Sequence, residues 1–363
     1  MLKWIEIDLN VIGANVRAVK KALNPGVAFM AVVKEDGYGH GALEISRTAL
    51  ANGAGALGTL TLEEAALLRR QGVKAPIAAL APAPASSAAG FIKLGVTPTV
   101  DSLNFIKALD RGTPAGRKTY YTIDIDSGLK RWGVAPAGLP AFLKATLKFK
   151  KAVPSAISTH IAYAPLKNMI EAEEKLSSFR ESGEYAKRFY PGLKLCAANS
   201  AVLCDFPHWQ LDMARIGNLL YGLYPSKVYI NKTKGPPIKG LKRPWKFYAR
   251  IISIKKVRKG ESLGYASEYV ACKPMSIATV PAGYADGLTL EPSEKSIRIS
   301  AGQAYWGVIN GREAPFVGRS AIAHTLLDIT GIPGVRIGTP VLLPVRRTAA
   351  SARIIRIYKN SGQ

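Results

Sequence analysis

The chain has few cysteines, no long apolar run and a shortage of acidic residues. Its 363 residues include three cysteines, which are too few and too irregularly spaced for a disulfide framework or a metal cluster. No hydrophobic run approaches the length of a membrane span, and the N-terminal MLKWIEIDLN alternates and carries acids instead of forming a signal-peptide core. We therefore expect a cytoplasmic protein with reduced thiols, no metal site and no membrane association.

Acidic residues are half as numerous as basic ones, with 25 Asp and Glu against 50 Lys and Arg, so the formal net charge is +25. Such a charge favours anionic ligands and long-range attraction to nucleic acid. The basic residues are spread out, however, with runs at 148–151, 232–246 and 255–259, and none forms a recognition module with interleaved base-stacking aromatics. We interpret the charge as a surface property and expect no specific nucleic-acid binding.

The first two-thirds of the chain alternates short apolar runs with helical patterns such as LEEAALLRRQ at 62–71, which carries acids in its first turn and bases in its last. This alternation predicts parallel strands joined by helices. Eight such units in about 230 residues are the size of an eight-stranded α/β barrel of the TIM type. The predicted strands are 28–33, 56–61, 76–80, 96–100, 120–126, 156–161, 193–197 and 213–216.

After the basic, Pro- and Gly-rich segment 230–246, the residue composition and the periodicity of the sequence change. From Lys246 onward β-branched residues, glycines and prolines dominate and helical periodicity fades. We therefore predict an α/β barrel over 1–238 and a smaller, mostly β domain over 239–363.

Polar residues stand at the ends of several predicted strands, where a barrel places its active site. They are Lys34, Asp126, His160, Asn199 with Ser200, and Arg215 with Gly217. A lysine in a confined, partly desolvated site has a lowered pKa and can form a Schiff base with an aldehyde such as pyridoxal phosphate. Ser200 and the amides near Gly217 and Asn218 could bind the phosphate, and Arg215 could face the ring nitrogen. Taken singly, each has an ordinary alternative as a surface or structural residue.

Six motifs in order carry a resemblance that the single residues do not. They are AVVKEDGYGHG at 31–41, STHIAYAP at 158–165, AANS at 197–200, MARIGNLLYG at 213–222, LGYASEYV at 263–270 and VPAGYADG at 280–287. Together they resemble the alanine racemases, which are fold-type III pyridoxal-phosphate enzymes. The similarity extends from WIEIDL at 4–9 to RIIRIY at 353–358.

The resemblance implies a role for each matching residue. Lys34 would hold pyridoxal 5'-phosphate and act as the base on one face of the substrate carbon. Tyr265, from the second subunit of a head-to-tail homodimer, would be the base on the opposite face, because inverting a stereocentre requires proton removal on one side and delivery on the other. The further cofactor positions would be Tyr38, His160, Asn199, Ser200, Arg215, Gly217, Asn218 and Tyr358. The substrate positions would be Arg131, Ile322 through its backbone amide, and Tyr284 at the entrance.

The chain departs from the family pattern in four places. Asp124 stands where the family usually has a lysine, often carbamylated, that orients the arginine matching Arg131, so we hypothesise that the Asp124 carboxylate holds Arg131 directly. Ala321, Ile322, Ala323 and His324 replace CMDQ, which removes an aspartate near the substrate, and no chemistry is assigned to His324. The other two departures are Cys196 in place of a histidine that supports the ring-nitrogen arginine, and Leu290 in place of an arginine.

Three hypotheses follow. The leading one is an amino-acid racemase that interconverts L- and D-alanine for cell-wall synthesis. The second is a racemase for another amino acid, or a related pyridoxal-phosphate enzyme, and it is favoured by the altered segment 321–324. The third is a non-catalytic protein with this fold that binds anions; the presence of both Lys34 and Tyr265 argues against it.

Overall fold

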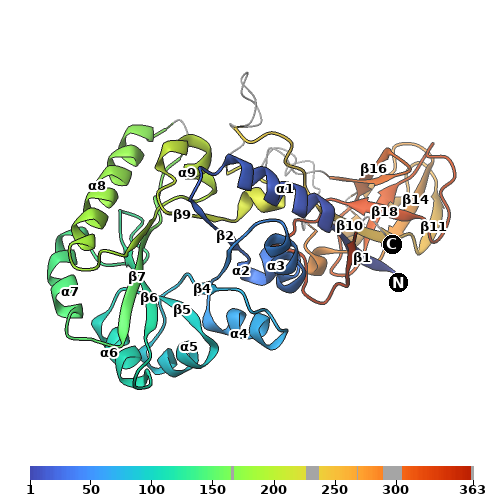
Figure 1. Cartoon of the computed structure of the whole chain (residues 1–363). Helices are drawn as coiled ribbons and strands as arrows, with labels where there is room; N and C mark the ends of the chain where they lie inside the picture. The colour runs from blue at the N-terminus through green and yellow to red at the C-terminus, as the bar shows by residue number, and fades with distance from the viewer. Residues whose placement is uncertain (165–166, 226–236, 268, 289–304, 361–363) are drawn as a thin grey trace. The chain divides into compact units, whose positions relative to one another are not determined.

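A computed structural model describes residues 1–164, 167–225, 237–267, 269–288 and 305–360. The chain divides into two compact units, one formed by Leu9–Arg243 and the other by Met1–Asp8 together with Pro244–Gln363. This differs from the division predicted at residue 238, because the first eight residues belong to the C-terminal unit. Each unit is described in turn (Figure 1).

Leu9–Arg243 contains an eight-stranded sheet in which all neighbouring strands are parallel, in the order β8-β7-β6-β5-β4-β3-β2-β9. The two end strands approach each other through a bridge between Ala198 and Ala214, which nearly closes the barrel. The predicted barrel is therefore confirmed. Its strands are β2 (Ala28–Val32), β3 (Ala56–Thr59), β4 (Ile77–Ala79), β5 (Val96–Val100), β6 (Thr119–Ile125), β7 (Ala152–Thr159), β8 (Lys194–Cys196) and β9 (Met213–Ile216).

Helices surround this sheet (Figure 1). Side-chain caps fix where two of them begin: the Thr61 hydroxyl accepts a hydrogen bond from the Glu64 amide at the start of α4, and the Ser102 hydroxyl accepts one from the Phe105 amide at the start of α6. The helices are α1 (Leu9–Ala22), α2 (Lys34–Tyr38), α3 (Ala42–Ala51), α4 (Leu62–Arg70), α5 (Ala88–Leu94), α6 (Leu103–Gly112), α7 (Leu139–Thr146), α8 (Met169–Lys187) and α9 (Ser200–Asp205).

The C-terminal unit is mostly β, as predicted, with a nine-stranded sheet in the order β11-β14-β17-β16-β15-β18-β10-β1-β19 and a β12-β13 hairpin. Strand β1 (Lys3–Asp8) pairs antiparallel with β10 (Trp245–Arg250) and parallel with β19 (Arg356–Lys359), which explains why the first residues belong here. The other strands are β11 (Ser253–Val257), β12 (Ser262–Leu263), β13 (Tyr269–Val270), β14 (Met275–Val280), β15 (Trp306–Ile309), β16 (Arg312–Val317), β17 (Thr325–Asp328) and β18 (Pro340–Leu343).

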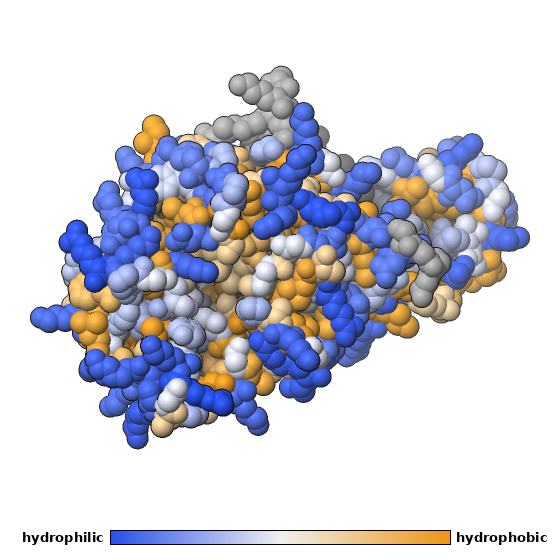
Figure 2. Space-filling view, viewed as in Figure 1, coloured by the Kyte–Doolittle hydropathy of each residue, from blue (hydrophilic) through white to orange (hydrophobic). Residues whose placement is uncertain are grey.

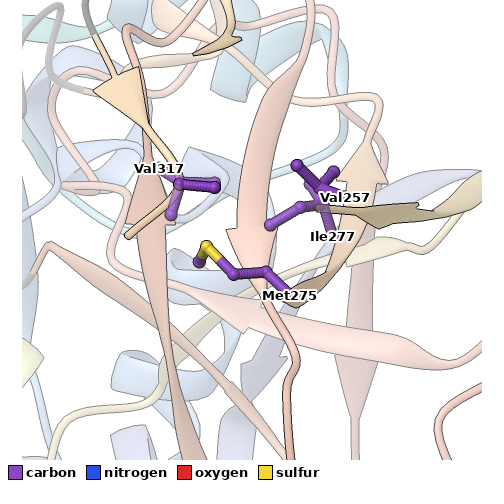
Figure 3. Packing of buried hydrophobic residues seen from close by; sticks show 5 residues of the cluster. Val257, Met275, Ile277 and Val317 are labelled. Atoms are coloured by element: carbon purple, nitrogen blue, oxygen red, sulfur yellow. The ribbon is translucent and has the colours of Figure 1, made fainter. Parts of the chain in front are cut away.

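A small apolar cluster packs part of this unit. Val257, Met275, Ile277 and Val317 converge from β11, β14 and β16, together with the buried Ala271 (Figure 3). The edge strand β11 exposes two lysines, Lys255 and Lys256, which is a common device against edge-to-edge pairing. The cluster therefore forms the core of this end of the sheet while the edge stays charged.

Hydrophilic residues lie over the whole face shown in Figure 2, with apolar residues between them, and do not gather in a single stripe. Among the described residues, no helix is long and apolar enough to cross a bilayer.

Candidate active site

A pocket of about 220 Å³ opens where the barrel strands end. It contains nine of the thirteen predicted site residues, although they come from five separate segments of the chain. Its lining consists of Val32, Lys34, Tyr38, Leu60, Leu80, Asp124, Arg131, Trp132, His160, Asn199, Ser200, Ala201, Arg215, Gly217, Asn218 and Pro225. The carboxyl ends of the strands thus bring together the polar groups that the sequence separates.

Lys34 begins a left-handed turn directly after β2. Glu35, Asp36, Gly37 and Tyr38 all have positive φ, at 51°, 51°, 61° and 55°. Such a conformation costs about 1–2 kcal/mol for each non-glycine residue. Side-chain carboxylates offset this cost: Glu64 accepts from the Glu35 amide at 2.7 Å and Asp36 from the Ala42 amide at 2.9 Å. The sharp turn fixes the place of the amine at the barrel mouth.

The pocket is rich in positive charge. Burial lowers the pKa of Lys34, and the nearby Arg131 and Arg215 lower it further against the opposing effect of Glu64 and Glu35. A larger fraction of this amine is therefore neutral and nucleophilic at pH 7 than of a surface lysine. The same cations make the pocket attractive to phosphate and carboxylate groups.

One corner of the pocket offers donors to an anion. The Gly217 amide donates to the Ser200 hydroxyl at 3.3 Å, and Asn218 follows at the start of a short 3-10 turn. A Cβ atom at Gly217 would lie 2.3 Å from the Tyr38 hydroxyl, so only glycine lets this phenol approach the backbone. The Tyr38 ring packs against Tyr221, with centroids 4.7 Å apart. This arrangement brings two hydroxyls and backbone amides to one place.

Asn199 has a role that the sequence did not assign to it. Its side-chain oxygen accepts from the amides of Ala201 and Val202 at 2.8 and 3.0 Å, which caps α9. Asn199 is thus the N-cap, and Ser200, the first residue of α9, lines the pocket.

Arg215, at the end of β9, lies across the floor of the pocket. One terminal nitrogen donates to the carbonyl of Thr159. Its Nε atom is buried, and no group within the described ranges bonds to it. A buried donor without a partner is costly, so this atom fits a ligand with an acceptor such as an unprotonated ring nitrogen.

Asp124 is buried beside these arginines and accepts a hydrogen bond from Ser158 at 2.5 Å. Burial raises its pKa to about 6, although Ser158, Arg215 and Arg131 oppose the rise. Over the part of the chain that is described, no ion pair joins Asp124 to Arg131. The guanidinium of Arg131 instead stacks on Trp132, 3.8 Å from its ring centroid. The hypothesis of direct contact is therefore wrong, and Asp124 acts on Arg131 only at longer range.

His160 lies in the pocket with an exposed edge. Desolvation, with Arg215, Arg131 and Lys34, lowers its pKa to about 3. The ring is neutral at pH 7, so it can orient a ligand by hydrogen bonding or stacking but does not add to the positive charge.

The other four predicted residues belong to the C-terminal unit. Tyr265, Tyr284 and Ile322 have exposed fractions of 62%, 39% and 58%. Two contacts bring their segments near one another: the amide of Tyr284 donates to the carbonyl of Ala321 at 3.1 Å, and the ring centroids of Tyr265 and His324 are 6.3 Å apart. Tyr358 is separate from this group, on β19 opposite Ile7 of β1.

Trp132 is a pocket residue that sequence reasoning missed. Its position directly after Arg131 in KRWGV was the available indication, because an aromatic next to a binding-site arginine can stack on it. Cys196 is buried in the barrel, where burial raises its pKa and leaves it a neutral thiol. Leu290 lies outside the described residues.

Comparisons with known proteins agree with this geometry. The family model "Alanine racemase, N-terminal domain" matches residues 7–225, and "Alanine racemase, C-terminal domain" matches residues 245–359. The chain belongs to the alanine racemase family. It is 34% identical over 353 residues to the alanine racemase of Desulfosudis oleivorans, with 94% of this chain and 86% of that protein covered.

Two further relatives extend the comparison. The alanine racemase of Desulfovibrio desulfuricans is 33% identical and covers 94% of this chain and 88% of its own length. The crystal structure of the alanine racemase of Bacillus anthracis with bound L-Ala-P has a TM-score of 0.87 and 28% identity, and covers 99% of this chain and 96% of its own. Both alanine racemase domains are thus represented along nearly the whole chain.

Proposed function

We propose that this protein is a pyridoxal 5'-phosphate-dependent alanine racemase. The observation that carries the proposal is the pocket, which combines a lysine of lowered pKa, a buried arginine donor that bonds to none of the described residues, and a corner of hydroxyls and amides. These three features fit the aldehyde, the ring nitrogen and the phosphate of that cofactor, in that order. The names of the relatives make alanine the first substrate to test.

When bound, pyridoxal phosphate withdraws electrons from the amino acid and makes its α-proton removable. Ser200, Gly217, Asn218 and Tyr38 would hold the phosphate, and the Nε atom of Arg215 would donate to the ring nitrogen. Asn199 would support this corner by capping α9. Tyr358 is proposed as a further phosphate-binding residue on the resemblance alone. The neutral His160 would line the ring.

Arg131 would bind the substrate carboxylate, with the backbone amide of Ile322 as a second donor. Lys34 would hold the cofactor and exchange the proton on one face of the substrate carbon. Tyr265 would exchange it on the opposite face. The lowered pKa of Lys34 suits this task because a base must be partly unprotonated at working pH.

We propose that Tyr265 acts in the pocket of a second copy of the chain, in a head-to-tail homodimer. The exposed Tyr265, Tyr284 and Ile322 on one part of the C-terminal unit support this, since exposed aromatic and aliphatic side chains are typical of interfaces. Tyr284 would then lie at the entrance to the partner's pocket.

The first experiment is spectroscopic and kinetic. The purified protein should have a visible absorption band that borohydride removes, and it should exchange D- and L-alanine faster than other amino acids. The Tyr265→Phe variant should keep the band and lose the exchange. A protein without the band would contradict the proposal.

The second experiment tests the shared site. Lys34→Ala and Tyr265→Phe, each inactive alone, should recover roughly a quarter of wild-type activity when their subunits are mixed and reassorted, because half of the dimers then carry one intact site. If both residues act within one chain, the mixture stays inactive.

A second candidate is racemisation of another amino acid. Ala323 removes a polar side chain beside Ile322, and Trp132 adds an aromatic wall to the pocket. A protein with the cofactor band that exchanges a different amino acid faster than alanine would establish this alternative.

A further inference from the structure

We propose that Trp132 is a positioning residue that orients Arg131 toward a substrate carboxylate by stacking beneath its guanidinium. The inference rests on the proposed function, in which Arg131 binds that carboxylate. It assigns to an uncharged aromatic ring the orienting task that the sequence suggested for the acidic Asp124.

The contact between the two side chains is close. The guanidinium carbon of Arg131 lies 3.8 Å from the centroid of the Trp132 ring, well inside the range of about 6 Å over which a cation is attracted to an aromatic face. Arg131 is exposed and Trp132 half-buried in the wall of the pocket. An exposed arginine samples many rotamers, and a stacking energy of about 1 kcal/mol favours one orientation by roughly five- to sixfold.

The loop that carries the pair is held from within. The Asp126 carboxylate accepts from the amides of Gly128 and Lys130 at 2.9 and 3.0 Å. Two backbone hydrogen bonds join the ends of the loop. The Asp126 amide donates to the Val134 carbonyl at 3.1 Å, and the Val134 amide donates to the Asp124 carbonyl at 2.8 Å. A tied loop keeps the tryptophan ring in place, which a positioning role requires.

Gly133, directly after Trp132, completes this arrangement. Its φ is 111°, and an added Cβ would lie 2.7 Å from the Asp126 amide nitrogen. Its own amide donates to Asp101 at 3.2 Å. The chain therefore turns sharply at Gly133, and the preceding ring is fixed against the barrel mouth.

No acid competes for Arg131 in the parts of the chain that the structure describes: none forms an ion pair with it. Asp124 is engaged by Ser158. A carboxylate that bound Arg131 would use some of its N–H donors, whereas a ring beneath the guanidinium plane leaves all the edge donors free. Stacking thus orients the arginine without neutralising it.

The kinetic test compares Trp132→Leu with Trp132→Phe. We expect Trp132→Leu to raise KM for the amino acid about fivefold with kcat within about twofold, and Trp132→Phe to recover part of the loss because it keeps an aromatic face. The ratio of variant to wild-type KM should not change between pH 5.5 and 8.5, because neither partner titrates there. An unchanged KM in Trp132→Leu, or a fall in kcat alone, would overturn the inference.

A binding measurement separates this inference from the proposed function. Acetate is titrated calorimetrically into the cofactor-loaded wild type, Trp132→Leu and the control Trp306→Leu, which removes an exposed tryptophan of the C-terminal unit. We expect about fivefold weaker acetate binding in Trp132→Leu only. If the wild type racemises no amino acid and this difference still appears, the proposed function fails and the positioning role stands. Equal acetate affinities would refute the positioning role whatever the activity.

Discussion

The barrel contains two hollows that differ in chemistry although Arg215 and Leu80 line both. The pocket at the carboxyl ends of the strands holds Lys34, Arg131 and Asp124 and measures about 220 Å³. The second hollow, of about 280 Å³, lies between the strands themselves and near their beginnings. Its lining is Met30, Ala56, Pro76, Ile77, Ala78, Leu80, Thr97, Thr99, Thr122, Ser155, Ala156, Ser158, Gly192, Lys194, Cys196, Met213 and Arg215.

The difference shows that residues at the carboxyl ends of the strands and residues within the strands supply different kinds of side chain. Residues at the strand ends, or shortly after them, supply the charged groups of the upper hollow, and the left-handed turn after β2 fixes Lys34 there. Residues within the strands supply alanines, threonines and serines, where barrels of this type usually place large branched side chains. The upper hollow, which we propose as the binding site, is thus rich in charged groups, while the lower one is lined largely by small side chains.

The largest expected effect removes the amine of the upper pocket. Lys34→Ala should lower racemase activity by about 10³-fold or more and abolish the borohydride-sensitive band, because both the anchor and one base are lost. Lys34→Arg serves as the control that keeps a positive charge but no readily deprotonated amine. Circular dichroism would check that both variants fold, and residual activity within tenfold of the wild type would rule out this role of Lys34.

The buried carboxylate of Asp124 in the upper pocket gives the next effect. Asp124 has a pKa of about 6 in the folded chain and an ordinary value of 3.8, so unfolding favours its ionised form. Its contribution to stability is therefore lost as the pH rises through this range, by up to about 3 kcal/mol. The free energy of unfolding of Asp124→Asn should gain on that of the wild type between pH 4 and pH 7.

Urea denaturation at several pH values measures this difference. Asp110→Asn is a suitable comparison because Asp110 accepts hydrogen bonds from the amides of Lys151 and Ala152 at 2.7 and 3.0 Å, outside both hollows. A constant difference between Asp124→Asn and wild type across the pH range would show that the carboxyl has an ordinary pKa.

Much of the fold was predictable from local pattern. The predicted strands 96–100 and 213–216 agree with β5 and β9 residue for residue, because short apolar runs between helices with clear caps leave few alternatives. The place of KWIEID was not predictable in this way. Its alternation indicates a strand, but its partners β10 and β19 lie more than 230 residues away.

The candidate site, too, was partly predictable from the sequence and partly not. Motifs in sequence order indicated which side chains would share the pocket, and nine of them do. Contacts between neighbouring side chains could not be predicted from the sequence. Asp124 has the right charge to hold Arg131, yet Asp124 is hydrogen-bonded by Ser158, and Arg131 stacks on Trp132. Which of two nearby groups an arginine selects depends on side-chain direction, which residue spacing does not encode.

A smaller effect tests the corner that we propose for the phosphate. Gly217→Ala should weaken pyridoxal phosphate binding to the cofactor-free protein about tenfold, because the added methyl displaces the Tyr38 hydroxyl. Gly138→Ala is the control, since an added Cβ there meets no atom within 4 Å. Absorbance titration with pyridoxal phosphate gives both dissociation constants, and equal values would show that the corner does not bind this cofactor.

The smallest effect concerns the lower hollow. Ala156→Val adds two methyl groups that point into unfilled space, so the free energy of unfolding should rise by about 1 kcal/mol with activity unchanged. Ala152→Val, in the same strand β7 but buried outside the hollow, should instead destabilise by about 1 kcal/mol through overpacking. Thermal and urea unfolding of the two variants and the wild type measures these changes in stability. If both variants lose stability, the lower hollow is already filled by water bound to its hydroxyls. The two hollows would then differ in what they bind and not in how well they are packed.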